Sequence, residues 1–230
     1  MKKKLVISTG AGISAESGLS TFRDSNGLWE NYDVMEVASA DGFRRNPQLV
    51  HDFYNARRLQ LAHVEPNAAH LGLVELENDY DVYIITQNVD DLHERAGSTN
   101  ILHLHGELMS IRANDNSGKR WHLQGYAAQT SPETRIEGHP VRPDIVFFQE
   151  AVPNMEPAAK LASEADIFVV IGTTLVVYPA AALIQYVRPG VPIYYIDPNP
   201  ADVPSYVHVI RKPATEGVAE LIKILRSGLE

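Results

Sequence analysis

The sequence predicts an α/β protein built on a doubly wound parallel sheet of the Rossmann type, with a smaller lobe formed by two inserts. Three observations lead to this fold class. Short, nearly continuous apolar runs are typical of parallel strands that are covered on both faces. Helical patterns alternate with these runs, as a doubly wound sheet requires. A glycine-rich turn follows the first run directly, where such folds bind a dinucleotide.

Four apolar runs predict strands of the sheet, and the clearest of them is closed by Gly172. These expected strands span residues 5–8, 82–86, 167–171 and 192–196. Apolar positions at helical spacing predict five helices between and after them, one of which Asn67 can cap. The expected helices span residues 47–61, 67–76, 155–165, 178–187 and 216–225.

Two stretches interrupt this alternation, and we interpret them as the inserts that together form the smaller lobe. Residues 30–64 are mostly helical in pattern. Residues 107–143 are polar, contain Asn, Gly, Ser and Pro, and show little periodicity. The remaining residues, 1–29, 65–106 and 144–230, make up the expected sheet domain.

Composition and charge exclude several classes of function. The formal net charge of −9 argues against nonspecific nucleic-acid binding, which needs a basic surface, but it suits a basic target such as a lysine-rich protein segment. The chain has no cysteine, which excludes disulfides, thiolate nucleophiles and cysteine-ligated zinc. Its first apolar run is too short for a signal peptide, and no run approaches the roughly 18 residues of a membrane helix. We therefore expect a cytoplasmic protein without nucleic-acid or membrane partners, whose oligomeric state stays open.

The glycine-rich turn, GAGISA at residues 10–15, fits the pattern G-x-G-x-x-[GA]. Its glycines permit a tight turn and a close approach of the backbone to a pyrophosphate, which then sits at a helix N-terminus. A hydride-transferring enzyme also needs an acidic residue about 20 positions later, at the end of a second strand. Residues 22–30 are loop-like instead, so the dehydrogenase interpretation fails, and a plain glycine turn stays an alternative at this point.

Polar residues gather after three other expected elements. The sequence TQNVD at 86–90 follows a strand, HLHG at 103–106 lies beyond a short helix, and GTT at 172–174 follows the most apolar strand. The carboxyl ends of parallel strands share one edge of the sheet, where an α/β fold binds its ligand. We therefore expect these segments and the glycine loop to converge on one site.

In these motifs the sequence resembles the sirtuins, a family of NAD-dependent protein-lysine deacylases. The matching pieces are GAGISAESGLSTFR at 10–23, ITQNVDDLHERAG at 85–97, HLHGEL at 103–108, GTTLVVYPAA at 172–181 and IDPNP at 196–200. They occur in family order and cover nearly the whole chain apart from 109–141. The resemblance implies that NAD is consumed as a co-substrate. The acyl group leaves an acylated lysine of a partner protein, giving nicotinamide and O-acyl-ADP-ribose.

The resemblance also assigns residues to the NAD site and to catalysis. The resemblance implies a pyrophosphate loop at Gly10, Ala11, Gly12, Ser14 and Ala15, and a loop over the nicotinamide at Phe22 and Arg23. It implies a pocket for the nicotinamide and its ribose at Gln87, Asn88 and Asp90. The adenosine half is implied at Gly172, Thr173, Thr174, Asp197, Pro198, Asn199 and Ala214. The family usually has Asn where Asp197 stands. His105 matches the general base, a role that suits a side chain with a near-neutral pKa. We interpret His103 as structural, and His70 and His93 as packing or surface residues.

Tyr54 and Arg57 lie three residues apart in the expected helix 47–61, so they share a face, with Phe53 and Leu61 on its packing side. Taken alone, such an arginine is usually a solvated charge. In the class III sirtuins, which remove malonyl, succinyl and glutaryl groups, a Tyr-x-x-Arg pair lines the acyl pocket. There an arginine can grip a carboxylate with two hydrogen bonds. The resemblance therefore implies a desuccinylase and demalonylase that also removes acetyl groups.

The sequence departs from most sirtuins in the zinc module, which carries two C-x-x-C pairs. The aligned positions here fall near Ala113, Asn116, Thr134 and Glu137, which cannot form a thiolate site, so we expect no metal. Asp115, His122 and His139 lack tight ligand spacing. A small apolar cluster is expected in its place, formed by Trp121, Leu123, Tyr126 and Val141.

A second departure lies in the segment that pairs with the substrate peptide, which usually reads V-V-W-F-G-E. Here residues 145–150 read IVFFQE, with Phe147 in place of Trp and Gln149 in place of Gly. Gln149 lacks the backbone freedom of glycine, which can narrow the groove or change the peptide preference. Val146 and Phe148 are the candidates to contact the acyl-lysine stem.

Two other functions stay open on the sequence. The same fold can transfer ADP-ribose to a protein, and a non-catalytic NAD-binding sensor would keep the cofactor motifs. The intact His105 and the Tyr54–Arg57 pair favour deacylation over ADP-ribose transfer, and the retained base and nicotinamide pocket argue against a sensor.

Overall fold

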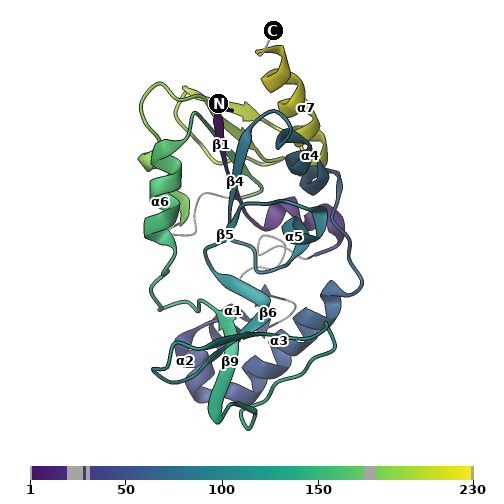
Figure 1. Cartoon of the computed structure of the whole chain (residues 1–230), viewed down its shortest axis with the longest axis vertical. Coiled ribbons are helices and arrows are strands. Elements are labelled where there is room, and N and C mark those ends of the chain that lie inside the picture. The colour runs from purple at the N-terminus through teal and green to yellow at the C-terminus, as the bar shows by residue number, and fades with distance from the viewer. Residues whose placement is uncertain (1, 20–27, 30–31, 174–179, 229–230) are drawn as a thin grey trace.

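The computed structural model describes residues 2–19, 28–29, 32–173 and 180–228, and the structural statements below concern these residues. Six parallel strands form the large sheet in the order β12-β11-β10-β1-β4-β5 (Figure 1). They are β1 (Lys4–Thr9), β4 (Asp81–Thr86), β5 (Ile101–His103), β10 (Ile167–Ile171), β11 (Ile193–Ile196) and β12 (Val207–Ile210). The strand order reverses between β1 and β10, and such a reversal opens a crevice at the carboxyl ends of the strands.

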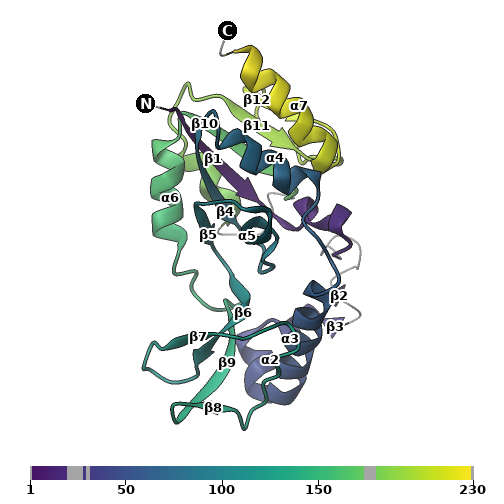
Figure 2. The ribbon, with the colours of Figure 1, turned by 45° about the vertical axis from the view of Figure 1, so that its right-hand side comes forward.

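Helices cover both faces of this sheet (Figure 2). On one face α4 (Ala68–Leu76) and α7 (Ala214–Ser227) bury Leu5, Ile7 and Val169. On the other face α6 (Met155–Glu164) and the 3₁₀ helix Ala180–Tyr186 bury Val6, Phe168 and Val170. Alternate strand residues thus feed two separate cores, which confirms the predicted doubly wound α/β fold.

The expected strands are all present, but the sequence did not reveal β5 and β12. Both lie at the edges of the sheet. β5 has only three residues, all half-buried, and β12 exposes its two middle residues, His208 and Val209. Neither segment therefore has the continuous apolar run by which a central parallel strand is recognised.

Local capping signals set the helix boundaries. α3 spans Pro47–Leu61 as predicted, because the Asn46 side chain accepts a hydrogen bond from Leu49 N at 3.1 Å and Pro47 occupies the first turn. Asn67 caps α4 by accepting from Ala69 N at 2.9 Å. The expected helix at 178–187 is described as a 3₁₀ helix from Ala180 onward, and α7 begins two residues before the predicted start. In the described ranges, no helix combines the length and apolar character that a bilayer span needs.

The small lobe lies at the end of the molecule opposite the two termini (Figures 1 and 2). It contains α1 (Val34–Val37), α2 (Ala40–Arg45), α3 and a four-stranded antiparallel sheet in the order β7-β6-β9-β8. The sheet strands are β6 (Gly106–Ala113), β7 (Arg120–His122), β8 (Arg135–Ile136) and β9 (His139–Ile145). The short pair β2 (Leu28–Trp29) and β3 (Tyr32–Asp33) leads into α1, and α5 (Leu92–Ala96) connects β4 with β5.

The apolar cluster expected in the second insert is wrong for Tyr126 and stays a prediction for Trp121, Leu123 and Val141. Tyr126 packs instead against the core of the lobe, which contains Val50, Phe53 and Phe147. The Trp121 ring lies 6.1 Å from the ring of His139. In the insert β6 pairs with β7 and with β9, and Ile111 and Val141 on these strands are buried.

Candidate active site

A cavity of about 600 Å³ lies at the carboxyl edge of the large sheet and extends into the small lobe. Its walls come from the turns after β1, β4, β5, β10 and β11, from α3, and from the segment after β9. All predicted site residues within the described ranges line it, namely Gly10, Ala11, Gly12, Ser14, Ala15, Tyr54, Arg57, Gln87, Asn88, Asp90, His105, Val146, Phe148, Gly172, Thr173, Asp197, Pro198, Asn199 and Ala214. Phe22, Arg23 and Thr174 lie outside the described residues.

The glycine loop packs directly on the turn after β10. Gly12 N donates to Gly172 O at 2.8 Å, and a Cβ atom on Gly12 would lie only 2.6 Å from Gly172 Cα. Gly172 itself has a φ of +64°. These glycines are therefore required for packing as well as for ligand approach. Two single-turn 3₁₀ helices, Ala11–Ile13 and Ala15–Ser17, follow the loop, so the α-helix expected after it is absent there.

Three buried polar side chains form a hydrogen-bonded network behind the loop. Asn88 Nδ2 donates to Ser14 Oγ at 3.1 Å, and Ser14 Oγ donates to Asp90 Oδ2 at 3.0 Å. Asp90 Oδ1 accepts from Leu92 N at 3.1 Å. Burial raises the pKa of Asp90 to about 6, against the lowering effect of the Leu92 and Ser14 donors. The network fixes the orientation of these polar groups at the cavity wall.

The two ring nitrogens of His105 have different roles: Nδ1 binds the backbone, and Nε2 is left to accept a proton. Its Nδ1 lies 3.1 Å from the carbonyl oxygen of Gln87, which can only accept, so Nδ1 carries the proton. Nε2 of the neutral ring is then a proton acceptor. Burial lowers the pKa of His105 below its ordinary value, while the Gln87 carbonyl opposes the shift. The ring is therefore neutral at physiological pH.

The other predicted histidines are held by structural contacts. His103 Nε2 lies 2.7 Å from Glu94 Oε1 and its Nδ1 lies 3.1 Å from Asn88 O. Burial opposes charge on this ring, but Glu94 nonetheless raises the pKa of His103. His70 and His93 are fully buried, with ring centroids 5.0 Å apart, and neither lines the cavity.

The far end of the cavity is shaped by the turns after β10 and β11. Asp197 is buried, and its Oδ1 accepts from Asn199 N at 2.8 Å. Tyr195 Oη donates to Thr173 O at 2.7 Å. The aspartate that replaces the usual asparagine thus supports the loop that carries Pro198 and Asn199 into the wall.

The small-lobe end of the cavity carries Tyr54 and Arg57 on α3. Arg57 is only 6% exposed, and its Nη1 donates to Gln60 Oε1. Burial raises the pKa of Tyr54, so its hydroxyl keeps its proton. The neighbouring lining is apolar and consists of Leu19, Ala38, Leu61, Leu108, Ile145 and Phe147. Arg57 and Tyr54 thus stand beside apolar side chains of the lobe core, with the charges of Arg142 and Glu150 also acting on Tyr54.

The segment after β9 connects this pocket to the large domain. Val146 N donates to His105 O at 2.9 Å. Phe148 N donates to Ala38 O at 2.8 Å, and its carbonyl accepts from Ala40 N at 3.1 Å. The Phe148 side chain is 43% exposed. The backbone of Phe148 is therefore bonded along one edge to the loop before α2.

Sequence reasoning missed Glu150, which also lines the cavity. Its Oε1 pairs with Arg142 Nη1 at 2.7 Å, and its Oε2 accepts from Phe147 N at 2.9 Å. Burial opposes ionisation, but Arg142 still holds the pKa of Glu150 below its ordinary value. The acidic end of the family's peptide-binding segment was the signal that pointed to it.

The positions aligned with zinc ligands show no metal centre in the described part of the chain, where no group of three His, Cys, Asp or Glu residues could hold an ion. His139 Nδ1 lies 2.7 Å from Asp115 Oδ2, and Glu137 pairs with Lys119. These candidate ligands are thus engaged with each other or with a cation. The expectation that the lobe binds no zinc stays a prediction.

Known proteins resemble the chain over almost its full length. An NAD-dependent protein deacylase of Bacteroides thetaiotaomicron is 50% identical, covering 97% of this chain and 98% of its own length. An NAD-dependent protein deacylase of Helicobacter pylori (strain 26695) is 51% identical and covers 96% of both chains. These relatives confirm the predicted enzyme class, an NAD-dependent protein deacylase.

Solved structures agree with this relationship. A Sir2 homologue mutant in complex with ADP-ribose superposes with a TM-score of 0.89 at 36% identity, covering 99% of this chain and 94% of that chain. A complex of a Sir2 homologue with NAD gives a TM-score of 0.87 at 36% identity, covering 100% and 91%. The profile of the Sir2 family matches residues 10–179. The chain therefore belongs to the Sir2 family.

Proposed function

We propose that this NAD-dependent protein deacylase prefers acyl groups that end in a carboxylate, such as succinyl and malonyl, and removes acetyl groups less efficiently. The observation that carries the proposal is the position of Tyr54 and Arg57. Both line the cavity that also contains His105, and Tyr54 packs in the apolar core of the small lobe. The preference for acidic acyl groups follows from placing a cation and a hydroxyl donor in such a pocket.

The cavity fits NAD in size and in the distribution of its polar groups. Its volume of about 600 Å³ falls in the range of small-molecule and cofactor sites. Residues 10–12 would hold the pyrophosphate, Asn88 and Asp90 the nicotinamide ribose, and residues 197–199 the adenosine. When bound, NAD supplies the ribose carbon that accepts the acyl oxygen as nicotinamide departs.

His105 is the general base in this proposal. Its protonated Nδ1 is held by the Gln87 carbonyl, which leaves Nε2 to take a proton from a hydroxyl in the cavity. The lowered pKa keeps Nε2 unprotonated at neutral pH.

Arg57 and Tyr54 would bind the carboxylate of the acyl group. A guanidinium matches a carboxylate with two parallel N–H donors, and Gln60 steadies it from one side. The Tyr54 hydroxyl, kept protonated by burial, supplies a further donor. An acetyl group offers neither donor an acceptor at that distance along the chain, so it gains less binding energy there.

The substrate peptide would lie along the segment after β9. Because the backbone of Phe148 is bonded to Ala38 and Ala40, a peptide that adds as a strand would pair along the opposite edge of this segment. Val146 and the half-exposed Phe148 would contact the acyl-lysine stem.

The test compares kcat/KM for matched succinyl-, malonyl- and acetyl-lysine peptides, with the products followed by mass spectrometry. Arg57→Met should lower the succinyl and malonyl rates about 100-fold or more, and the acetyl rate by less than about threefold. Arg57→Lys should recover only part of the loss, because a lysine keeps the charge without the planar fork. Tyr54→Phe should give a smaller change in the same direction.

Three outcomes would contradict the proposal in different ways. Equal losses on all three peptides would remove the role of Arg57 in acyl selection and leave the deacylase chemistry intact. ADP-ribose found on the peptide or protein would favour the transferase alternative. NAD bound with every peptide unchanged would favour a sensor. Melting temperatures of all variants show whether a loss reflects unfolding.

A further inference from the structure

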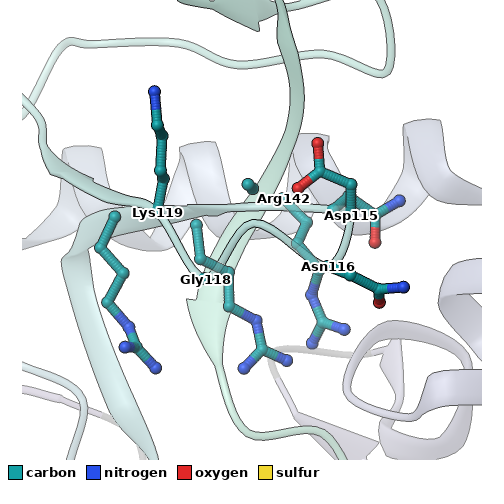
Figure 3. A pocket seen from close by; sticks show the side chains of 9 residues that line it. Asp115, Asn116, Gly118, Lys119 and Arg142 are labelled. Atoms are coloured by element: carbon teal, nitrogen blue, oxygen red, sulfur yellow. The ribbon is translucent and has the colours of Figure 1, made fainter.

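We propose that a second cavity, in the small lobe, binds a phosphate-type oxyanion at a site separate from the NAD cavity. This open cavity of about 320 Å³ lies beside the loop between β6 and β7, and Arg142 in the middle of β9 also lines it (Figure 3). It is lined by Arg112, Ala113, Asn114, Asp115, Asn116, Gly118, Lys119, Arg120 and Arg142. None of these residues lines the NAD cavity.

Three arginines stand in one row across the antiparallel sheet. Arg112 on β6 is registered directly opposite Arg120 on β7 and directly opposite Arg142 on β9. Residues that face each other across antiparallel strands have their side chains on the same side of the sheet. Like charges in directly opposite positions destabilise a sheet, so a row of three guanidiniums needs anions close by.

Two carboxylates meet part of this need. Asp144 Oδ2 accepts from Arg120 Nε at 2.8 Å, while Glu150 binds Arg142 at 2.7 Å and Arg112 at 3.1 Å. Two carboxylates against three guanidiniums leave one positive charge in the row. Burial lowers the pKa of Arg112, and the neighbouring Arg142 lowers it further. A bound anion would relieve this repulsion.

The cavity also offers hydrogen-bond donors that the protein itself does not use. Arg120 is 58% exposed along its side chain, and among the described residues only its Nε has a hydrogen-bond partner. Within the same ranges, the side chains of Asn114 and Asn116 make no hydrogen bonds. Figure 3 shows the side chains of Lys119 and Arg142 pointing in opposite directions. Lys119 pairs with Glu137.

The donor set selects the ligand class. Planar guanidiniums and amide N–H groups match tetrahedral or planar oxyanions, which accept several hydrogen bonds at once. The carboxylates of Asp144 and Glu150 would repel a bound anion. The anion must therefore contact the exposed edge of the Arg120 guanidinium and the amides of Asn114 and Asn116. A small, multiply charged oxyanion such as phosphate or sulfate fits that requirement.

The site shares a wall with the NAD cavity. Glu150 lines the NAD cavity and binds Arg112 and Arg142, which line the oxyanion cavity. An anion that draws Arg112 toward itself competes with Glu150, whose carboxylate also accepts from Phe147 N. Occupancy of the second cavity is thereby linked to the segment after β9.

Binding is tested by calorimetric titration of inorganic phosphate into the full chain. The ionic strength is kept constant by letting phosphate replace sodium chloride stepwise. The titration is repeated with NAD at saturation, because the glycine loop of the NAD cavity is itself able to hold phosphate. We expect one phosphate site that persists when NAD is bound. Arg120→Gln should weaken it about tenfold, as expected for the loss of a charge-assisted hydrogen bond.

Two variants make the result specific to the cavity. Arg135→Gln removes the same charge from an exposed position on β8 of the same lobe, and it should leave phosphate binding unchanged. Asp144→Asn removes the carboxylate that competes for Arg120, and it should tighten binding about threefold. Three results would overturn the proposal. The phosphate site could disappear when NAD is bound, or sodium chloride could give the same binding signal as phosphate. Arg120→Gln and Arg135→Gln could also weaken phosphate binding equally.

Discussion

Gln149, which lines the active-site cavity, is joined to Asp41 by two hydrogen bonds. Gln149 Nε2 donates to Asp41 Oδ2 at 2.8 Å, and Asp41 N donates to Gln149 Oε1 at 3.1 Å. Gln149 has a φ of +75°, in the left-handed region that costs a non-glycine residue about 1–2 kcal/mol. The pair offsets this strain and fastens the segment after β9 to the first turn of α2.

The pair can be measured as a coupling energy. Asp41→Ala should destabilise the protein by about 1–2 kcal/mol, because the Gln149 Nε2–Asp41 Oδ2 hydrogen bond and the Asp41–Arg44 ion pair are lost while Gln149 stays strained. In a chain that carries Gln149→Gly the same change should cost much less, since glycine adopts this conformation without strain and has no side chain to bond Asp41. Urea unfolding of the four proteins gives the coupling. If Asp41→Ala destabilises the wild type and the Gln149→Gly variant equally, Asp41 contributes to stability only through its ion pair with Arg44.

The protonation state of His105 predicts the acid side of the pH profile. His105→Ala should lower kcat at least about 100-fold while NAD binding is retained. Because burial lowers the pKa of His105 below 6.5, its Nε2 stays available at neutral pH. The rate in the wild type should stay level from about pH 8 down to about pH 6.5 and fall at lower pH. An acid limb with its midpoint above pH 7 would contradict this assignment.

Buried histidines predict a loss of stability in acid. Burial lowers the pKa values of His51 and His70 to about 4 and that of His93 well below its ordinary value. In the unfolded chain these side chains bind protons near pH 6.5. Between about pH 6.5 and pH 4 the unfolded state therefore binds more protons, and the free energy of unfolding falls as the pH falls, by up to about 3 kcal/mol for each group.

Urea unfolding at a series of pH values tests this dependence. His70→Gln should reduce the slope of the unfolding free energy against pH by the equivalent of about one bound proton, since it replaces one of the three buried rings. The exposed His63 provides the control, and His63→Gln should leave the slope unchanged. Asp90, with a pKa raised to about 6, and His103, whose pKa is also raised, act in the opposite sense, while His105 adds to the effect of the three buried rings. A slope that His70→Gln does not alter would contradict the prediction.

Sequence reasoning succeeded where the signal is local or belongs to a family motif. The bounds of α3 followed from Pro47 and the helical pattern after it, and residues 86–90 follow a strand that the sequence identifies on its own. It failed where the cause lies in distant partners. The row formed by Arg112, Arg120 and Arg142 depends on strand register inside an insert without apolar periodicity. Likewise, Gln149 was recognised as a departure from the family, but its partner is 108 residues away.

Gly106 combines two constraints that a matched pair of variants can separate. It follows His105, has a φ of +87°, and a Cβ atom there would lie 1.8 Å from the carbonyl oxygen of Asp144. Gly138 has a similar φ of +83°, but no described atom lies within 4 Å of its added Cβ. Gly138→Ala therefore reports the conformational cost alone, about 1 kcal/mol.

Gly106→Ala should destabilise the protein by at least about 3 kcal/mol more than Gly138→Ala, since β6 and β9 must separate to admit the methyl group. The two strands meet at this point, where Gly106 is registered opposite Ile145. Because Val146 N donates to His105 O, the same separation should also displace the base and lower kcat in any protein that still folds. Urea unfolding compares the two variants. Similar losses of stability would mean that the sheet accommodates the methyl group, and would remove steric exclusion as the reason for glycine after His105.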